Sequence, residues 1–395
     1  MKSATPSLMP EEEVLFVSFE DLREFEKAAF QSMGIPEEDA QICADVLFEA
    51  DCRGIDSHGV GRLFMYYVRV KRKQQNAITK IDVENERSGM ARLNANNGMG
   101  QVVSHKAMQM AIDKAKDCGI GMVTVGESNH YGIAGYFSLM AANQDCIGIT
   151  GTNARPSIAP TWGVEPMIGT NPLTIAVPCD WDFHWFADHA TSITQRGKIE
   201  QYARIDKEVP KGWVINSQGE EPSNPHEILK DMLEKKAALN PLGGSGELLG
   251  GHKGYNYATF VEIMSAGLSS AAFLQNCLGF HKENGKTVFD PYRLGHFFIA
   301  IDISAFEDLD TFKKTVGDIL RDCANAKKQP GAEKIYVAGE KEYLTFLERQ
   351  KTGVPLEAAT QLQLQQMVQE LDIDMSKFDF KWTVEYKGGA DAQGW

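Results

Sequence analysis

Apolar positions in the first 73 residues recur three or four apart, which is the spacing of one buried helical face. Ser18 and Asp21 form a capping pair that predicts a first helix, and Gly34 predicts its end. Pro36 stands where a second helix would begin. The buried stripe of that helix would be Ala40, Cys43, Leu47 and Ala50. A further helix is predicted over residues 60–73, so the N-terminal part of the chain should be helical.

From about residue 88 the pattern changes to short apolar runs that alternate with helical segments. The predicted strands cover residues 90–93, 121–125, 147–150 and 295–302. The predicted helices cover residues 107–115, 133–143, 255–274 and 312–324. A strand, a helix and a strand within about 30 residues indicate an α/β unit. Glycine and proline concentrate over residues 151–180, which predicts loops on a rigid scaffold, whereas the chain after Met375 is polar and predicts no element.

The composition is that of a globular protein with an acidic surface. Of the 395 residues, 43% are apolar and 24% are charged, and the formal net charge is −14. The length favours two or three domains. An acidic total argues against a nucleic-acid-binding protein, and the one basic run, Arg69–Lys73, is interpreted as a solvated helix end. Because negative charge does not attract anions, an acidic substrate would need local arginines to hold it.

Segments typical of membrane, secreted and metal-binding proteins are missing from the sequence. No run of about 18 apolar residues predicts a membrane span, and residues 1–13 lack the apolar stretch of a signal peptide. The seven cysteines are scattered, without a Cys-x-x-Cys pair, which predicts reduced thiols in a cytoplasmic protein. The spacing of histidines and cysteines fits no metal site, so no metal is expected.

The first concentration of reactive side chains lies at residues 53–62. If a helix begins near Ser57 or Gly59, then His58, Arg62 and Tyr66 fall on one face of it, four residues apart. A guanidinium can grip a carboxylate with two hydrogen bonds, and an imidazole can exchange a proton near neutral pH. The alternative is structural, with Ser57 capping the helix and His58 on the surface.

A second concentration of polar residues, Glu127–Gly132, follows a predicted buried strand. In α/β units ligands bind at the carboxyl ends of strands, so His130 stands where a catalytic acid/base would act. The alternative is a histidine that caps the next helix. The turn-rich segments 153–156 and 169–172 could expose backbone N–H groups to an anion, although any loop rich in proline and glycine looks similar.

Glycine-rich segments are the third candidate, because backbone N–H groups at a helix start can hold a phosphate. Lys253 would be the cation of such a site in residues 243–255, although the segment matches neither phosphate-loop spacing nor Gly-x-Gly-x-x-Gly. Gly98–Gly100 approaches that dinucleotide fingerprint, but Val103 replaces its third glycine, which argues against a Rossmann site. The residues by themselves indicate an enzyme acting on a small anion, without indicating hydride transfer.

Several short segments, taken in order, resemble the malate/L-lactate dehydrogenase family that lacks the Rossmann fold. The members of this family include malate, L-lactate, ureidoglycolate and sulfolactate dehydrogenases. The resemblance runs from about residue 18 to residue 356, and its order and spacing are more specific than any one motif. The segments that carry it are Asp56–Val60 with Arg62, Ser128–Gly132, Gly169–Pro172, Asp188–Ser192, Pro241–Gly244, His252–Tyr255, Gly339–Glu340 and Gly353–Pro355.

The resemblance implies an α/β (α+β) fold and a homodimer. It implies a non-Rossmann NAD(P)-binding domain with a large mixed, mostly antiparallel sheet, beside a helical N-terminal region. On this basis residues 1–86 would be the helical, substrate-side region and residues 87–150 an α/β segment carrying the acid/base. Residues 151–300 would form the NAD(P)-binding domain, and residues 301–395 would return to the main domain before a polar tail.

The resemblance also implies roles for individual residues. His130 would be the acid/base for the 2-hydroxyl proton, with His58 as the alternative, and Arg62 would grip the substrate carboxylate. Ser57 and Tyr66 would line the same pocket. The residues expected to contact NAD, or alternatively NADP, are Asp188, Ala190, Thr191, Ser192, Lys253, Gly339 and Glu340.

The expected reaction moves a hydride between a nicotinamide and C2 of a small 2-hydroxy acid, with malate or lactate as the first substrates. A four-carbon diacid needs a second cation, for which Arg155 and Arg53 are candidates. The alternatives are a reductase of a cyclic imine or of a sugar-derived 2-oxo acid, and a catalytically silent binding protein. His189 stands where the family usually has methionine, and Lys198 and Arg204 are candidate partners for the 2′-phosphate of NADP.

Overall fold

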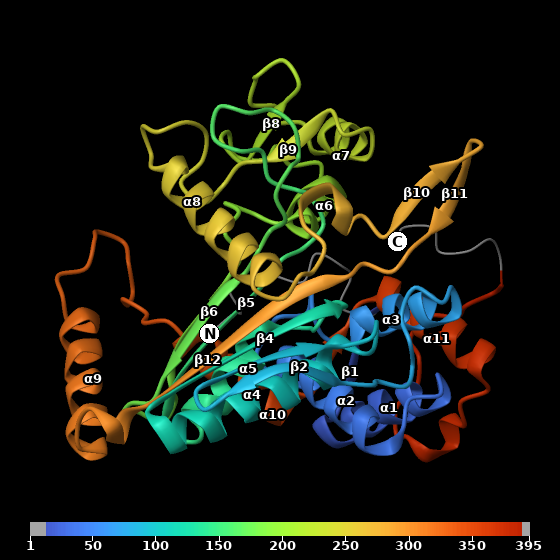
Figure 1. Cartoon of the computed structure of the whole chain (residues 1–395). Helices are drawn as coiled ribbons and strands as arrows, with labels where there is room; N and C mark the ends of the chain where they lie inside the picture. Colours follow the sequence, from blue (N-terminus) through green and yellow to red (C-terminus); the bar gives the residue numbers. More distant parts are fainter. Residues whose placement is uncertain (1–12, 389–395) are drawn as a thin grey trace.

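A seven-stranded sheet forms the centre of the computed structural model, which describes residues 13–388 (Figure 1). The strands in spatial order are β2 (Asp82–Arg87), β3 (Met90–Asn94), β4 (Ile120–Ser128), β12 (Leu294–Asp302), β5 (Cys146–Thr152), β6 (Leu173–Val177) and β7 (Trp185–His189). Every neighbouring pair is antiparallel except β3 and β4, which run parallel. The predicted α/β fold with a mixed, mostly antiparallel sheet is therefore confirmed.

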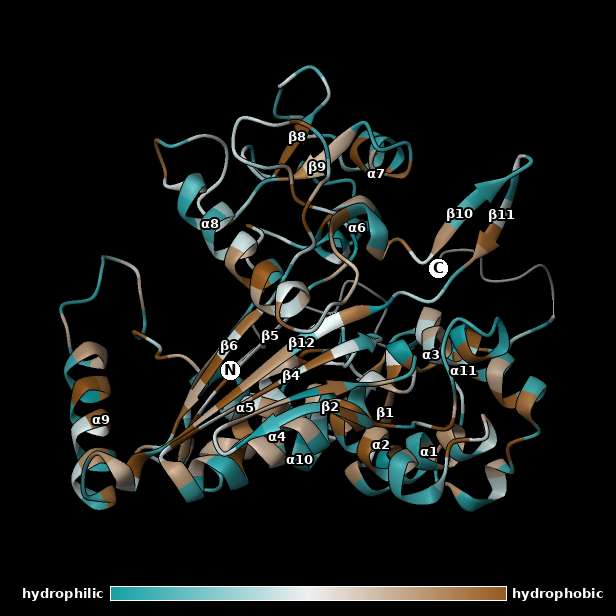
Figure 2. Ribbon diagram, in the orientation of Figure 1, coloured by the Kyte–Doolittle hydropathy of each residue, from teal (hydrophilic) through white to brown (hydrophobic). Residues whose placement is uncertain are grey.

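Two layers cover the two faces of this sheet. Helices α4 (Gly100–Cys118) and α5 (Ala134–Ala142) lie on one face, and α8 (Gly251–Glu262) with the π-helical turn Ile263–Gly267 lies on the other (Figure 1). The turn approaches β12 closely, because a Cβ on Gly295 would stand 2.2 Å from a backbone oxygen of the turn. Hydrophobic residues run along the central strands between the layers (Figure 2).

A helical layer packs beside the sheet and carries the N-terminal helices. It contains α1 (Phe19–Ser32), α2 (Glu37–Cys52), α3 (Leu63–Lys71), α10 (Glu340–Thr352) and α11 (Ala358–Leu371). Ser18 caps α1 by accepting a hydrogen bond from the backbone N–H of Asp21, as predicted. The chain closes on itself here, because β1 (Leu15–Val17) pairs with β13 (Val354–Leu356).

A small lobe with its own apolar core stands above the sheet (Figure 1). It contains α6 (Arg196–Arg204), β8 (Val214–Asn216), α7 (Pro225–Leu233) and β9 (Ala237–Leu239). A hairpin projects beside it, made of β10 (Phe280–Glu283) and β11 (Lys286–Phe289). Helix α9 (Leu309–Ala324) lies at the opposite end of the molecule (Figure 1).

Several predicted boundaries were wrong. The start proposed near Ser57 was wrong, because turns continue to Gly59. The helix predicted over residues 60–73 is confirmed: it begins as a 3-10 helix over Val60–Arg62 and continues as α3 to Lys71. The helix predicted over 107–115 is the longer α4, and the one predicted over 255–274 ends as a π-turn at Gly267. The segment after Met375, predicted from its composition to be polar, also carries aromatic side chains that pack against the helical layer. Its aromatic rings at Phe378, Phe380 and Trp382 pack edge-on against Phe25 of α1.

Strands from the first three of the predicted segments share one sheet. The division of the chain into domains at residues 86, 150 and 300 stays a prediction. All seven cysteines are free, five of them buried and Cys118 and Cys323 exposed. Across residues 13–388 no helix is long and apolar enough to cross a membrane. In the same range no group of three histidine, cysteine or acidic side chains could hold a metal ion.

Candidate active site around His130

His130 lies just beyond the carboxyl end of β4, in a turn that is fixed on both sides. The Asn129 side chain donates hydrogen bonds of 2.9 Å to the Gly98 carbonyl and the Asn97 side-chain oxygen. On the other side the Tyr131 ring stacks on His296 of β12, with 4.7 Å between ring centroids and 7° between planes. Since residues 129 and 131 are buried, the half-buried His130 between them is held in one direction.

The Nδ1 atom of His130 is engaged by protein groups. Tyr66 Oη lies 2.7 Å from it, and the backbone nitrogen of Gly132 lies 3.3 Å from it. Tyr66 is completely buried on α3, so its hydroxyl is a fixed support. Because a phenol can donate or accept, this contact suits either imidazole tautomer. The Nε2 atom is thus the one available to a substrate.

His58 reaches the same place from a loop rather than from a helix. Its ring is nearly parallel to that of His130, with 5.6 Å between centroids and 22° between planes. Ser57 Oγ lies 2.8 Å from His58 Nδ1. The sequence-based reason for grouping His58 with Arg62 and Tyr66 on one helical face was therefore wrong, because His58 lies in the turn before the helix. The structure nevertheless brings the side chains of Ser57, His58 and Tyr66 together with His130.

Buried carboxyls in the helical layer hold the loop that carries His58. Asp51 of α2 accepts a hydrogen bond of 2.7 Å from the backbone N–H of Val60. Gly59 passes so close to this carboxyl that a Cβ would stand 1.8 Å from Asp51 Oδ1. Burial raises the pKa of Asp51 to about 8 and, with the neighbouring Asp51 charge, raises that of Glu26. The pair therefore keeps at least one proton at neutral pH.

Both imidazoles of the site are held neutral by their surroundings. Burial, with the nearby Arg62 charge, lowers the pKa of His58 to about 3. Burial lowers the pKa of His130 well below its ordinary value, and the charges of His58, Arg69 and Arg62 act in the same direction. A neutral imidazole can accept a proton, so the arrangement fits a general base. The positive charge of Arg62 acts on both rings in this direction.

Two arginines besides Arg62 contribute to this positive environment. Arg62 Nε donates a hydrogen bond of 2.5 Å to the Ser57 carbonyl. Burial lowers the pKa of Arg62, and Arg69 and Arg155 lower it further. Interpreting Arg69 as part of a solvated helix end was wrong. Arg53 points elsewhere, since it is paired with Glu49 at 2.6 Å.

The spacing of α3 contains the signal that would have identified Arg69. Arg62, Tyr66 and Arg69 stand at positions i, i+4 and i+7, which share one helical face. In the sequence Arg69 is one of a run of basic residues. In the structure Arg69 is half-buried, whereas residues 71–73 are exposed. Glu26 and Asp51 gave no comparable signal, because nothing local distinguishes a buried carboxyl from an exposed one.

Asp188 of β7 uses its carboxylate within the protein. Its Oδ2 accepts a hydrogen bond of 2.8 Å from the backbone N–H of Gly135, in the first turn of α5. Its Oδ1 accepts one of 2.9 Å from Thr174 Oγ1. Asp188 thus connects the sheet edge to the helix that follows His130, and a role toward a cofactor stays a prediction. His189, the next residue, is exposed.

The residues predicted to follow Asp188 in a cofactor site lie beside the glycine-rich loop. The Thr191 carbonyl accepts a hydrogen bond of 2.8 Å from the backbone N–H of Leu242, and Ser192 forms a β-bridge with Pro241. Lys253 is exposed in the first turn of α8. Ser192 Oγ and His252 Nδ1 are buried without a hydrogen-bond partner among residues 13–388. Such orphaned polar groups beside a helix start fit a bound phosphate-bearing ligand.

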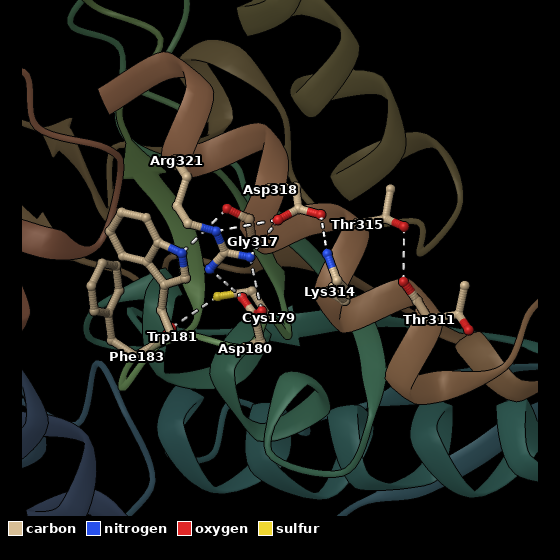
Figure 3. Close-up of polar contacts among 10 residues, drawn as sticks. All are labelled: Cys179, Asp180, Trp181, Phe183, Thr311, Lys314, Thr315, Gly317, Asp318 and Arg321. Carbon is tan, nitrogen blue, oxygen red and sulfur yellow. Dashed lines mark hydrogen bonds and ion pairs between the residues drawn. The ribbon is translucent and has the colours of Figure 1, made fainter. Parts of the chain in front are cut away.

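Gly339 and Glu340 begin α10 behind β7. A Cβ on Gly339 would lie 2.8 Å from the His184 carbonyl, so this glycine permits a close approach. Glu340 is paired with Lys334 and lines a hollow of about 410 Å³. Figure 3 shows the neighbouring Arg321 bound to Asp180 and Asp318, next to the Trp181 and Phe183 rings of that hollow.

Comparison with known proteins decides the family. The sequence model of malate/L-lactate dehydrogenase matches residues 17–365. The chain belongs to this family. It is an oxidoreductase of the 2-hydroxyacid dehydrogenase type, and the family works with pyridine nucleotides.

Similar proteins support this assignment over nearly the whole chain. Malate dehydrogenase of Pyrococcus abyssi is 42% identical over 337 residues, covering 85% of this chain and 90% of the relative. Malate/(S)-sulfolactate dehydrogenase of Methanothermus fervidus is 34% identical, covering 92% of this chain and all of the relative. The crystal structure of malate dehydrogenase from Entamoeba histolytica superposes with a TM-score of 0.86 at 43% identity, covering 91% of this chain and 99% of that one.

Proposed function

We propose that the chain moves a hydride between a nicotinamide cofactor and C2 of a small 2-hydroxy or 2-oxo acid. Malate and oxaloacetate are the first substrate pair, because several relatives carry the name malate dehydrogenase, and lactate and pyruvate are the second. The observation that carries the proposal is the Tyr66–His130 contact of 2.7 Å, which leaves His130 Nε2 available beside Arg62.

In the oxidation direction the 2-hydroxyl group loses its proton as C2 becomes a carbonyl. His130 accepts this proton at Nε2, while the proton on Nδ1 is held by Tyr66 Oη. In the reduction direction the imidazolium returns the proton to the carbonyl oxygen. Positioned proton transfer of this kind contributes roughly 10²–10⁴-fold to a rate. When bound, the nicotinamide supplies or takes the hydride.

Arg62 has two effects in this mechanism. Its planar guanidinium binds the carboxylate at C1 with two hydrogen bonds and so orients C2. The bound carboxylate also offsets the positive charge that depresses the pKa of His130. The imidazole therefore becomes more basic when the substrate is present, which suits it for proton transfer in both directions.

Residues around the glycine-rich loop are proposed to hold the cofactor. Lys253 would pair with the phosphates of the cofactor. The hydroxyl of Ser192, which is buried without a hydrogen-bond partner among residues 13–388, would bind the cofactor as well. The further contacts are proposed for Asp188, Ala190, Thr191, Gly339 and Glu340. NAD is proposed as the cofactor, with NADP as the alternative. Of the two candidate partners for a 2′-phosphate, Lys198 and Arg204, the second is paired with Glu357 at 3.0 Å. A homodimer and a cytoplasmic location are also part of the proposal.

A reduction assay tests the proposal directly. The protein is mixed with NADH or NADPH and with oxaloacetate, pyruvate or 2-oxoglutarate, and the nicotinamide absorbance is followed. We expect oxidation of the cofactor, fastest with oxaloacetate. If no 2-oxo acid and no cyclic imine reacts, and calorimetry detects no cofactor binding, the chain is a catalytically silent member of the family.

Two histidine variants test the assignment of the acid/base. We expect His130→Ala to lower kcat by roughly 10²–10⁴-fold while cofactor affinity is unchanged. His58→Ala is the matched comparison, because its ring lies beside His130 and its Nδ1 is held by the exposed Ser57. If His58→Ala abolishes turnover and His130→Ala does not, the two roles must be exchanged.

A further inference from the structure

Helix α3 carries a second arginine, Arg69, that the mechanism above does not use. Arg62, Tyr66 and Arg69 share one face of the chain segment, and Tyr66 reaches His130 from that face. Seven residues of helix correspond to about 10 Å along the axis. Arg69 therefore continues the row of polar groups past the acid/base, on the side away from Arg62.

The guanidinium of Arg69 is built into the protein. Its Cζ lies 4.3 Å from the centroid of the Tyr292 ring, so the ring supports one flat face. Its Nη1 atom is buried and has no hydrogen-bond partner among residues 13–388. A buried N–H donor without an acceptor destabilises the protein unless a ligand or water supplies one. The position and the unused donor indicate an anion site.

The neighbouring charges point to the same conclusion. The charges of Arg62 and Arg69 both lower the pKa of His130, and a third positive charge, that of Arg155, lowers the pKa of both arginines. The groups that chiefly oppose this repulsion at Arg69 are the phenols of Tyr292 and Tyr66. Phenols are neutral at pH 7, so they leave the positive charge uncompensated. A single substrate carboxylate at Arg62 would offset only part of it.

We infer that Arg69 binds a second anionic group of the substrate and makes the site selective for dianionic 2-oxo and 2-hydroxy acids. This inference rests on the proposed function for the first carboxylate, which Arg62 binds. A carboxylate and a sulfonate share the required chemistry, because each presents several oxygens to a guanidinium. Arg69 is thus a specificity-determining residue, distinct from the proton-transfer machinery.

Kinetics of an Arg69→Met variant measure this selectivity. The substrates are oxaloacetate and 3-sulfopyruvate as dianions, with 2-oxobutanoate as a monoanion of the same carbon number as oxaloacetate. We expect kcat/KM to fall about 10–100-fold for at least one dianion and to change less than about threefold for 2-oxobutanoate. The dianion that loses more identifies the preferred second group. Arg69→Lys should restore part of the loss, since it keeps the charge without the planar fork.

Arg72→Met is the matched control, because Arg72 also stands over an aromatic ring, that of Phe289, but is exposed. It should leave the ratio of dianion to monoanion kcat/KM unchanged. Equal losses for dianions and 2-oxobutanoate in Arg69→Met would overturn the inference. So would an unchanged ratio in a variant that melts at the wild-type temperature.

Binding without turnover separates this inference from the proposed function. Succinate and butanoate differ by one carboxylate, and their affinities are measured by calorimetry on the wild type and on Arg69→Met. We expect the variant to weaken succinate about 10-fold or more and butanoate less than about threefold. This result would support the anion site even if no 2-oxo acid is reduced. Equal affinities of wild type and variant for succinate would refute it even in an active dehydrogenase.

Discussion

Two clusters of buried ionisable groups lie on opposite sides of the loop that carries His58. On one side are the imidazoles of His58 and His130, and on the other the carboxyls of Glu26 and Asp51. Burial keeps both clusters largely uncharged, since it lowers the imidazole pKa values and raises the carboxyl ones. The same physical cause therefore produces neutral bases in one place and neutral acids in the other.

The clusters differ in what surrounds them. The imidazoles are half-buried and lie under the influence of the positive charges of Arg62 and Arg69, so we propose that a bound anion would raise their pKa values. The carboxyls are at most 1% exposed, and Asp51 is bound to the loop backbone through Val60. Access and partners, rather than the size of a pKa shift, separate a group that reacts from one that supports. The following changes test that distinction, beginning with the largest expected effect.

Asp51→Asn should remove much of the pH dependence of stability. Between pH 4 and pH 8 the Asp51 carboxyl is ionised when unfolded and protonated when folded, so wild-type stability falls as pH rises through this window. We expect the wild-type free energy of unfolding to drop on the order of 4 kcal/mol between pH 5 and pH 9, because each of the three pH units up to the folded pKa of about 8 corresponds to about 1.4 kcal/mol. The drop should be smaller in the variant, as measured by urea unfolding.

Asparagine keeps an oxygen for the Val60 N–H, so the loop should retain its bond in Asp51→Asn. Glu38→Gln, on the exposed side of α2, is the control and should keep the wild-type pH dependence. If the free energy of unfolding depends on pH equally in the wild type and in Asp51→Asn, the Asp51 carboxyl is not the cause of this pH dependence.

Gly59→Ala should displace the loop that carries His58 through a steric clash with Asp51. The new Cβ would meet Asp51 Oδ1 at 1.8 Å, which forces the loop or α2 to move. We expect a loss of about 1–3 kcal/mol in thermal unfolding and a lower kcat, because His58 and Arg62 flank the glycine. Gly61→Ala is the control, since its Cβ would meet neighbours only at 3.6 Å. Similar melting temperatures for both variants would contradict the close contact.

The imidazole cluster should take up a proton when an anionic substrate analogue binds. The anion offsets Arg62 and so raises the pKa of His130 toward neutrality. Affinity should therefore fall as pH rises, by up to about tenfold per unit for one proton taken up. Calorimetry with tartronate in buffers of different ionisation enthalpy counts the proton. The His130→Ala variant should show less uptake, and an unchanged uptake would assign the proton to another group.

Tyr66→Phe should have the smallest effect of the four. It removes the hydroxyl that holds His130 Nδ1 and leaves a buried hydroxyl-sized gap. We expect kcat/KM to fall about 5–10-fold, as the loss of about 1 kcal/mol of hydrogen bonding would give. Tyr131→Phe is the control, because its ring stacks on His296 and should keep doing so. A larger loss in Tyr131→Phe would show that the anchor of the turn matters more than the Nδ1 contact.

Local patterns in the sequence predicted much of the fold and the position of His130 in the candidate site. Ser18 and Gly34 bounded α1 correctly, and apolar runs predicted the centres of β4, β5 and β12. His130 was predicted from its place after a strand, because the chain itself creates that geometry. The short strands β6 and β7 were missed, since loop-forming residues dominate their neighbourhood.

Tertiary contacts decided what local patterns could not. The stretch from Ser57 to Gly59 has the composition of a helix start, but Asp51 holds it in a turn. Arg69 looked solvated among basic neighbours and is fixed by Tyr292, a residue more than 200 positions away. Such pairs carry no periodicity, so only the folded chain reveals them.

The pairing of β1 with β13 constrains when the N-terminal strand can fold during synthesis of the chain. Residues 15–17 form their ladder only with residues 354–356, so a ribosome must have released nearly the entire chain before β1 is paired. Helices α1 and α2 can pack on each other early, whereas the strand that precedes α1 receives its partner last. Contacts so distant in sequence slow folding. A nascent chain stopped before Val354 would carry every proposed reactive side chain and lack the ladder that holds the strand leading into α1.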